Sequence, residues 1–155
     1  MTPLPEPGRR ALIIGYGSPI RGDDAIGPLA ADRLADEGVP EGVTVLSRHV
    51  LTAELVEDIA AADLIVFIDA VAEGPPGEIR IRPLQPDASA LSTMAHFLDP
   101  RELLAWAETL YCHRPRAWLA SVAGATFDYG LYELSPAVAD ALRPLITQVR
   151  GLACP

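Results

Sequence analysis

The chain has 155 residues and a net charge of −9, and half of its residues are apolar. This length suits one domain with a single core. The acidic charge argues against nucleic acid or an anionic membrane as a partner, because both bind to a basic face. No apolar run approaches the roughly 20 residues of a transmembrane helix, and the first residues lack the apolar region of a signal peptide. We therefore expect a cytoplasmic protein and, from its small size and acidic surface, a monomer.

The apolar pattern predicts alternating strands and helices. Residues 1–9 are proline-rich and are expected to be flexible, within a single domain assigned to residues 1–155. Strands are expected at 11–16, 43–47, 64–70, 78–82 and 116–124. Helices are expected at 25–38, 52–62, 99–111 and 135–152. Thr52, Asp99 and Ser135 are the candidate N-caps, because short polar side chains bind the free N–H groups of a first helical turn.

This order of elements predicts an α/β fold: a single doubly wound domain with a five-stranded, mostly parallel sheet and helices on both faces. About seven residues join the strands at 64–70 and 78–82. A parallel crossover needs about a dozen, so the second of these strands should run antiparallel at an edge. If the first three strands lie in the order 2-1-3, the loops after strands one and three flank the switch point, where ligands bind in such sheets.

The segment GYGSPIRGDD, residues 15–24, begins like a dinucleotide-binding loop. The position of the third glycine holds Ile20, and no acidic residue follows the second strand, although Arg48 there could face an NADP 2′-phosphate. Asp23 and Asp24 stand at a helix N-terminus, where they would repel a phosphate. Nucleotide binding is therefore disfavoured. One aspartate is expected to cap the helix, and the other is left to bind a cation.

A third carboxylate, Asp69, ends the most apolar run of the chain, LIVFIDA. An aspartate buried there without a partner would be costly, which favours a functional role. If Asp24 and Asp69 converge at the switch point, they form a hard-oxygen site that is open on one side. His49 follows the second strand, and His96 lies just before the helix at 99–111. Two carboxylates and one imidazole would match nickel, zinc or iron(II).

Other catalytic arrangements are poorly supported. All twelve basic residues are arginines, which excludes lysine chemistry. The two cysteines, Cys112 and Cys154, form no CxxC motif and are expected to be free thiols. Cys112 and His113 are neighbours in sequence, which does not direct one side chain at the other, and His113 is expected to be solvated. The chain has neither a Gly-x-Ser-x-Gly nor a His-Glu-x-x-His motif.

Four segments resemble the maturation endopeptidases of nickel–iron hydrogenases. They are GYGSPIRGDDAIGPLAADRL, LIVFIDA followed by GPPGEIRI, His96 ahead of a leucine-rich helix, and GLYELSPAV. The resemblance runs from about residue 11 to residue 148 in the order of the family. Ser18 stands where the family usually has asparagine. The segment RHVLTAEL, which contains His49, replaces a Gly-Gly-Thr-like turn and is closer to a subgroup with His-x-Leu-Thr.

The resemblance implies a twisted five-stranded α/β fold and a peptidase that removes a C-terminal peptide from the nickel-loaded precursor of a hydrogenase large subunit. It implies that Asp24, Asp69 and His96 are the catalytic residues that contact nickel carried by this substrate, with no organic cofactor. The metal could polarise the scissile carbonyl or activate water, or serve recognition only, with Asp23 or Asp69 as general base. The alternatives are a nickel carrier or assembly chaperone without proteolysis, and a small-molecule metallohydrolase.

Overall fold

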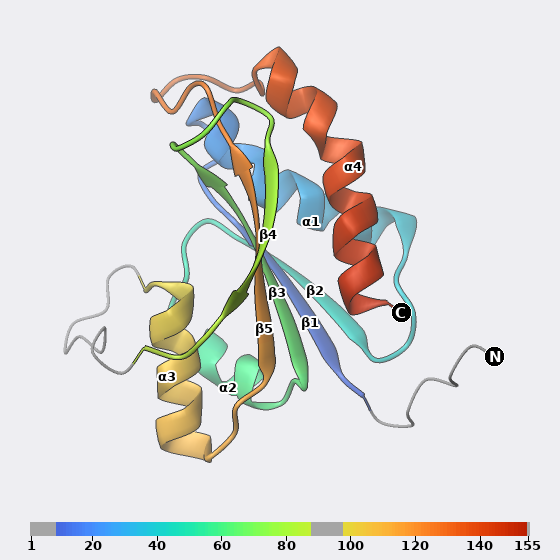
Figure 1. The fold of residues 1–155 in the computed structure, drawn as a ribbon, viewed down its shortest axis with the longest axis vertical. Helices are drawn as coiled ribbons and strands as arrows, with labels where there is room; N and C mark the ends of the chain where they lie inside the picture. The colour runs from blue at the N-terminus through green and yellow to red at the C-terminus, as the bar shows by residue number, and fades with distance from the viewer. Residues whose placement is uncertain (1–8, 88–97, 155) are drawn as a thin grey trace.

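The structure, a computed structural model, describes residues 9–87 and 98–154, which form a three-layer α/β domain (Figure 1). The strands of the sheet are β1 (Ala11–Tyr16), β2 (Val43–Arg48), β3 (Leu64–Val71), β4 (Ile79–Leu84) and β5 (Arg116–Ala123). The helices are η1 (Gly22–Ala25), a 3₁₀ turn, and α1 (Ile26–Glu37), α2 (Leu55–Ala60), α3 (Pro100–Tyr111) and α4 (Pro136–Ala153). The predicted fold class is confirmed.

The five strands of the described sheet lie in the order β2-β1-β3-β5-β4. Strand β1 pairs in parallel with both β2 and β3, and β3 pairs in parallel with β5. Strand β4 pairs antiparallel with β5 at the edge, because its short connection from β3 cannot form a crossover. The predicted 2-1-3 order and the antiparallel edge strand are both confirmed, so the loops after β1 and β3 do flank the switch point.

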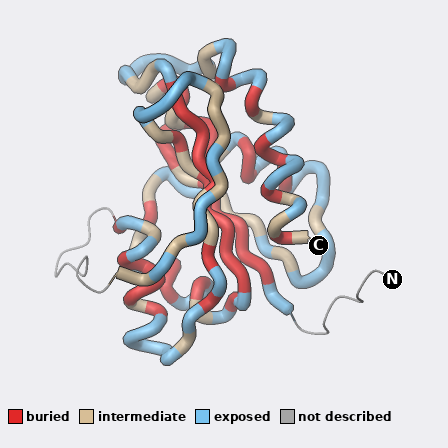
Figure 2. The backbone as a smooth tube through the Cα atoms, in the orientation of Figure 1, coloured by how far each residue is buried: buried red, intermediate tan, exposed pale blue. Residues whose placement is uncertain are grey.

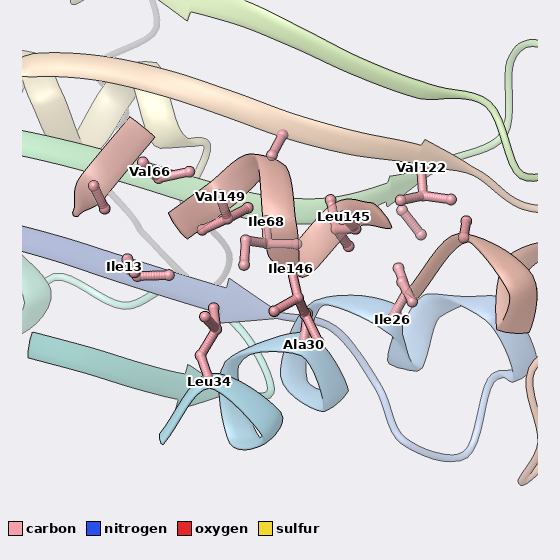
Figure 3. Close-up of a cluster of buried hydrophobic side chains, with 14 of the residues drawn as sticks. Ile13, Ile26, Ala30, Leu34, Val66, Ile68, Val122, Leu145, Ile146 and Val149 are labelled. Atoms are coloured by element: carbon pink, nitrogen blue, oxygen red, sulfur yellow. The ribbon is translucent and has the colours of Figure 1, made fainter. Parts of the chain in front are cut away.

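Helices α1 and α4 cover one face of the sheet, and α2 and α3 cover the other (Figure 1). On the first face, alternate residues of the strands, among them Ile13, Val66 and Val122, pack against Leu34 of α1 and Leu145 of α4 (Figure 3). The central strands are buried from both sides (Figure 2). Burial on both faces explains why their sequences are continuous apolar runs rather than alternating ones.

In three of four helices the predicted capping hydrogen bond does not form. Asp99 caps α3 as predicted, since its Oδ1 accepts the Arg101 N–H at 2.8 Å. Thr52 does not cap α2, which begins at Leu55. Ser135 occupies the N-cap position of α4, but its side chain makes no capping bond there. Neither aspartate caps α1, because the 3₁₀ turn η1 precedes this helix.

Two of the remaining sequence predictions concern the thiols and His113. Cys112 and Cys154 are free, as predicted. His113 is not fully solvated: it is half-buried, and its Nε2–H donates to the Ala62 carbonyl at 2.6 Å. Cys112 and His113 precede β5 and so lie at the opposite edge of the sheet from the end of β3. No helix within residues 9–87 and 98–154 is both long and apolar enough to cross a membrane.

A glycine lets α1 approach the sheet closely. A Cβ on Gly27 would lie 2.4 Å from the Tyr16 carbonyl oxygen and 2.6 Å from that of Ile68. Because both atoms belong to strand backbones, we expect Gly27→Ala to lower the free energy of unfolding by about 1–3 kcal/mol. Gly151 in α4 is the matched control: a Cβ there meets nothing within 4 Å, so Gly151→Ala should raise it by about 0.5–1 kcal/mol. Urea denaturation measures both, and equal shifts would contradict the close contact.

Candidate functional site

The site lies at the carboxyl edge of the parallel strands. Asp24 is in η1, which follows the loop after β1, and Asp69 is near the end of β3. Strand β3 contacts η1, and the charge of Asp24 contributes to the raised pKa of Asp69. The charge of Asp99, at the start of α3, also contributes to this raised pKa. The structure therefore joins Asp24 and Asp69 at the switch point.

The predicted histidines are placed differently. His49 follows β2 at the same edge, but it is exposed, and β1 lies between β2 and β3. His96 lies outside the described residues. It is two residues before Leu98, whose N–H donates to the Leu51 carbonyl in the β2–α2 loop at 3.3 Å. Leu98 therefore lies beside the β2–α2 loop, whereas β4, the last described strand before His96, ends at the opposite edge of the sheet, beside the start of β5.

The loop after β1 cannot cradle a phosphate, because its backbone donors are used. Every N–H from residue 17 to residue 24, where proline has none at 19, donates to an acceptor within the protein. Gly17 is required for the path of the backbone rather than for binding a phosphate. Gly17 has φ of 146°, and a Cβ on it would lie 2.0 Å from the Asp24 carbonyl oxygen. An anion site at a helix N-terminus needs free N–H groups, and this loop offers none.

Asp23 is fully buried and has a structural role. Its two carboxylate oxygens accept bonds from the N–H groups of Ser135, Ala125 and Thr126, at 2.7, 2.7 and 3.1 Å. The Ser135 hydroxyl also donates, at 2.8 Å. Burial alone would raise the pKa of Asp23, but these hydrogen bonds together lower it. Asp23 therefore ties η1 to the loop between β5 and α4, and it has little capacity left to take a proton from a reactant.

Asp69 has the opposite character. Burial raises its pKa to about 7, opposed by hydrogen bonds from the Tyr16 hydroxyl and from the Ala70 N–H at 2.8 Å. The same environment, burial first and then the Asp69 charge, raises the pKa of Tyr16, so this hydroxyl stays protonated. A carboxyl group that titrates near neutral pH is suited to proton transfer. Of the three aspartates, Asp69 is thus the one with the properties of a general base.

Tyr16 was missed by the sequence reasoning. It is the last residue of β1, and the register that pairs Gly15 with Ile68 places it next to Asp69. The signal was available: in the 2-1-3 order, the ends of the first and third strands are neighbours. Asp24 is half-buried, like Tyr16 and Asp69, and its Oδ2 accepts the Ser18 N–H at 2.7 Å.

The described residues alone do not form a metal centre. Within residues 9–87 and 98–154, no three His, Cys, Asp or Glu side chains are grouped so that they could hold an ion. Asp24 and Asp69 supply two carboxylates, and a cation bound by them would need further ligands. The arrangement offers two half-buried carboxylates, of which Asp69 has a pKa raised to about 7.

Solved structures give close matches to this fold. No protein-family model matches the sequence, and the curated proteins give no match. The [NiFe] hydrogenase maturation protease HycI from Thermococcus kodakarensis matches with a TM-score of 0.75 and 27% identity, over 96% of this chain and 94% of its own. A hydrogenase 2 maturation peptidase from a Thaumarchaeota archaeon matches with a TM-score of 0.68 and 27% identity, over 92% and 97%. The hydrogenase maturating endopeptidase HybD from E. coli, at 22% identity, shares the fold with a TM-score of 0.74, over 92% and 90%.

Proposed function

We propose that this chain, which belongs by structure to the [NiFe] hydrogenase maturation proteases, is an endopeptidase that removes a C-terminal peptide from the nickel-loaded precursor of a hydrogenase large subunit. Asp24, Asp69 and His96 contact the nickel, which belongs to the substrate. The observation that supports the proposal is that Asp24, in η1, and Asp69, in β3, both lie at the switch point of a sheet shared with these proteases.

The chemistry of the carboxylates supports recognition of a metal in the substrate. Oxygen ligands with one imidazole suit a borderline divalent ion such as nickel. Two described carboxylates make an incomplete site, so for an ion already held by the precursor, the precursor itself would supply the remaining ligands. Such an arrangement would act on the precursor only after nickel has been inserted, because without the metal the carboxylates have no partner in the substrate.

Two routes to hydrolysis follow from the sequence reasoning, and the contacts of Asp23 narrow the second. In the first, the nickel of the substrate polarises the scissile carbonyl or the attacking water. In the second, nickel serves recognition only, and a carboxylate takes the proton from water. Asp23 is engaged by the donors of residues 125, 126 and 135. Asp69, with a pKa of about 7, is therefore the general base in this second route.

The test is mass spectrometry of a hydrogenase large-subunit precursor incubated with the protein. We expect a discrete C-terminal peptide to be released from the nickel-loaded precursor and not from the nickel-free precursor. A maturation protease known to cleave the same precursor is the positive control for its competence. Stoichiometric binding to the precursor without cleavage would favour a nickel carrier or assembly chaperone. Hydrolysis of a model ester or phosphate with added metal, and an intact precursor, would favour a small-molecule metallohydrolase.

A further inference from the structure

The hydroxyl of Ser121 is a buried polar group with no hydrogen-bond partner in the described structure. The residue is 1% exposed, within the strand β5. A hydroxyl removed from water without a partner costs about 1–3 kcal/mol. An alanine would avoid this cost. Buried polar groups are paired in nearly all cases, so the unpaired hydroxyl of Ser121 calls for a physical explanation.

The sheet places Ser121 directly beside Asp69. The two are register partners on the parallel strands β5 and β3, which puts their side chains on the same face, about 4.8 Å apart along the sheet. Phe67 and Leu119, two residues earlier on each strand, pack into the apolar cluster under α2 and α3. Asp69 and Ser121 therefore lie on the same face of the sheet, nearer its carboxyl edge, where polar side chains follow the apolar ones.

The neighbour of Ser121 on its other side is engaged elsewhere. Arg80 on β4 is the antiparallel register partner of Ser121, but its guanidinium bonds the Glu78 carboxylate at 3.2 Å. Asp69 in turn accepts its bonds from Tyr16 and from the Ala70 N–H. In the structure described, Ser121 and Asp69 are thus adjacent but not bonded to each other. The Asp69 carboxylate on the neighbouring strand is an acceptor to which the hydroxyl could donate after a side-chain rotation.

We infer that Ser121 is a positioning residue whose hydroxyl donates to the Asp69 carboxylate when this carboxylate turns to engage the nickel of the bound precursor. The inference rests on the proposed function. Groups that hydrogen-bond a ligating carboxylate fix its orientation, and their loss typically costs about 10- to 100-fold in metal affinity or activity. In the free protein the hydroxyl has no partner, because Asp69 turns toward it only when the precursor is bound.

The test compares Ser121→Ala with Ser135→Ala. Ser135→Ala removes a hydroxyl that bonds Asp23 at 2.8 Å, so it should lower the free energy of unfolding. Ser121→Ala removes an unpaired hydroxyl and should leave that energy unchanged or raise it. With the nickel-loaded precursor, however, Ser121→Ala should reduce both affinity and cleavage rate about 10- to 100-fold, while affinity for the nickel-free precursor should not change.

A double-mutant cycle assigns the effect to Asp69. In an Asp69→Ala background, Ser121→Ala should cause no further loss of affinity for the nickel-loaded precursor, since the acceptor is already gone. Normal cleavage by Ser121→Ala, or an additive loss in the double variant, would overturn this inference and leave the proposed function intact. A loss of stability in Ser121→Ala equal to that of Ser135→Ala would overturn the unpaired state on which it depends. Failure of the unmodified protein to cleave would overturn both proposals.

Discussion

The Asp69→Asn variant should fold normally and yet lose cleavage of the nickel-loaded precursor by about 10²- to 10⁴-fold, the usual contribution of a positioned acid or base. An amide keeps the volume of the side chain and an oxygen that can accept the Ala70 N–H bond. It cannot take a proton from water, and it is a weaker ligand for a cation. Single-turnover cleavage followed by mass spectrometry measures the loss.

The matched control is Asp63→Asn, at the other end of the same strand. Asp63 immediately precedes β3, and its Oδ2 accepts the Arg10 N–H at 2.9 Å. Its amide should retain this bond, so cleavage should stay near that of the unmodified protein. Equal losses in both variants would mean that charge on β3, rather than the position of Asp69, controls the activity.

The stability of Asp69→Asn should depend on pH in a defined direction. Burial raises the pKa of Asp69 to about 7, from 3.8 for an ordinary aspartate. The folded protein therefore holds this proton more tightly than the unfolded chain, and the stabilisation it gives is lost as the pH rises toward 7. Asparagine does not ionise. In nickel-free protein, Asp69→Asn should thus be the more stable form at pH 8, by at most about 4 kcal/mol, and the difference should vanish below about pH 4. A constant difference across this range would contradict the buried, titrating carboxyl group.

The sequence was sufficient to predict the strands and their directions because the signals for both are local. The length of the β3–β4 connection forced an antiparallel edge, and apolar runs marked strands buried on both faces. Asp24 and Asp69 lie at the same edge because β1, which precedes the loop and η1, and β3 are neighbours in the 2-1-3 order. The sequence did not reveal the role of Asp23, since its donors lie more than 100 residues away, and no local pattern encodes such a contact. Ser121 carried a weak signal, as a lone hydroxyl within an apolar strand.

The helix caps also show that local sequence does not reveal contacts between distant parts of the chain. Asp99 behaved as its local sequence predicts because its partner, Arg101, is two residues away. Ser135 has an equally good capping sequence, but its hydroxyl bonds a buried carboxylate from another part of the chain instead. The hydrogen bond that a hydroxyl donates to a buried carboxylate is stronger than the one it accepts from a backbone N–H at a helix start. Tertiary contacts therefore changed the role of the residue without changing where the helix begins.

Asp23→Asn should be strongly destabilising, by about 2–4 kcal/mol, although it changes a single atom. Both oxygens of Asp23 face backbone donors: Oδ1 accepts from Ser135, and Oδ2 from Ala125 and Thr126. Whichever way the amide is turned, its NH₂ group meets an N–H, and a buried donor is left unpaired. Urea denaturation at pH 7 measures the loss of unfolding free energy.

The adjacent residue provides the control for this effect. Asp24 is partly exposed, and the hydrogen bond that the described structure gives its carboxylate comes from Ser18, so an amide oxygen can replace it. Asp24→Asn should change stability little, while impairing cleavage through loss of a carboxylate beside Asp69.

Since the pKa of Asp23 is lowered in the folded protein, its stabilisation is present above the ordinary aspartate pKa of 3.8 and is lost at lower pH. The difference in unfolding free energy between the Asp23→Asn variant and the unmodified protein should therefore decrease at acidic pH. Equal stabilities of the two neighbouring variants at pH 7 would contradict the structural role of Asp23.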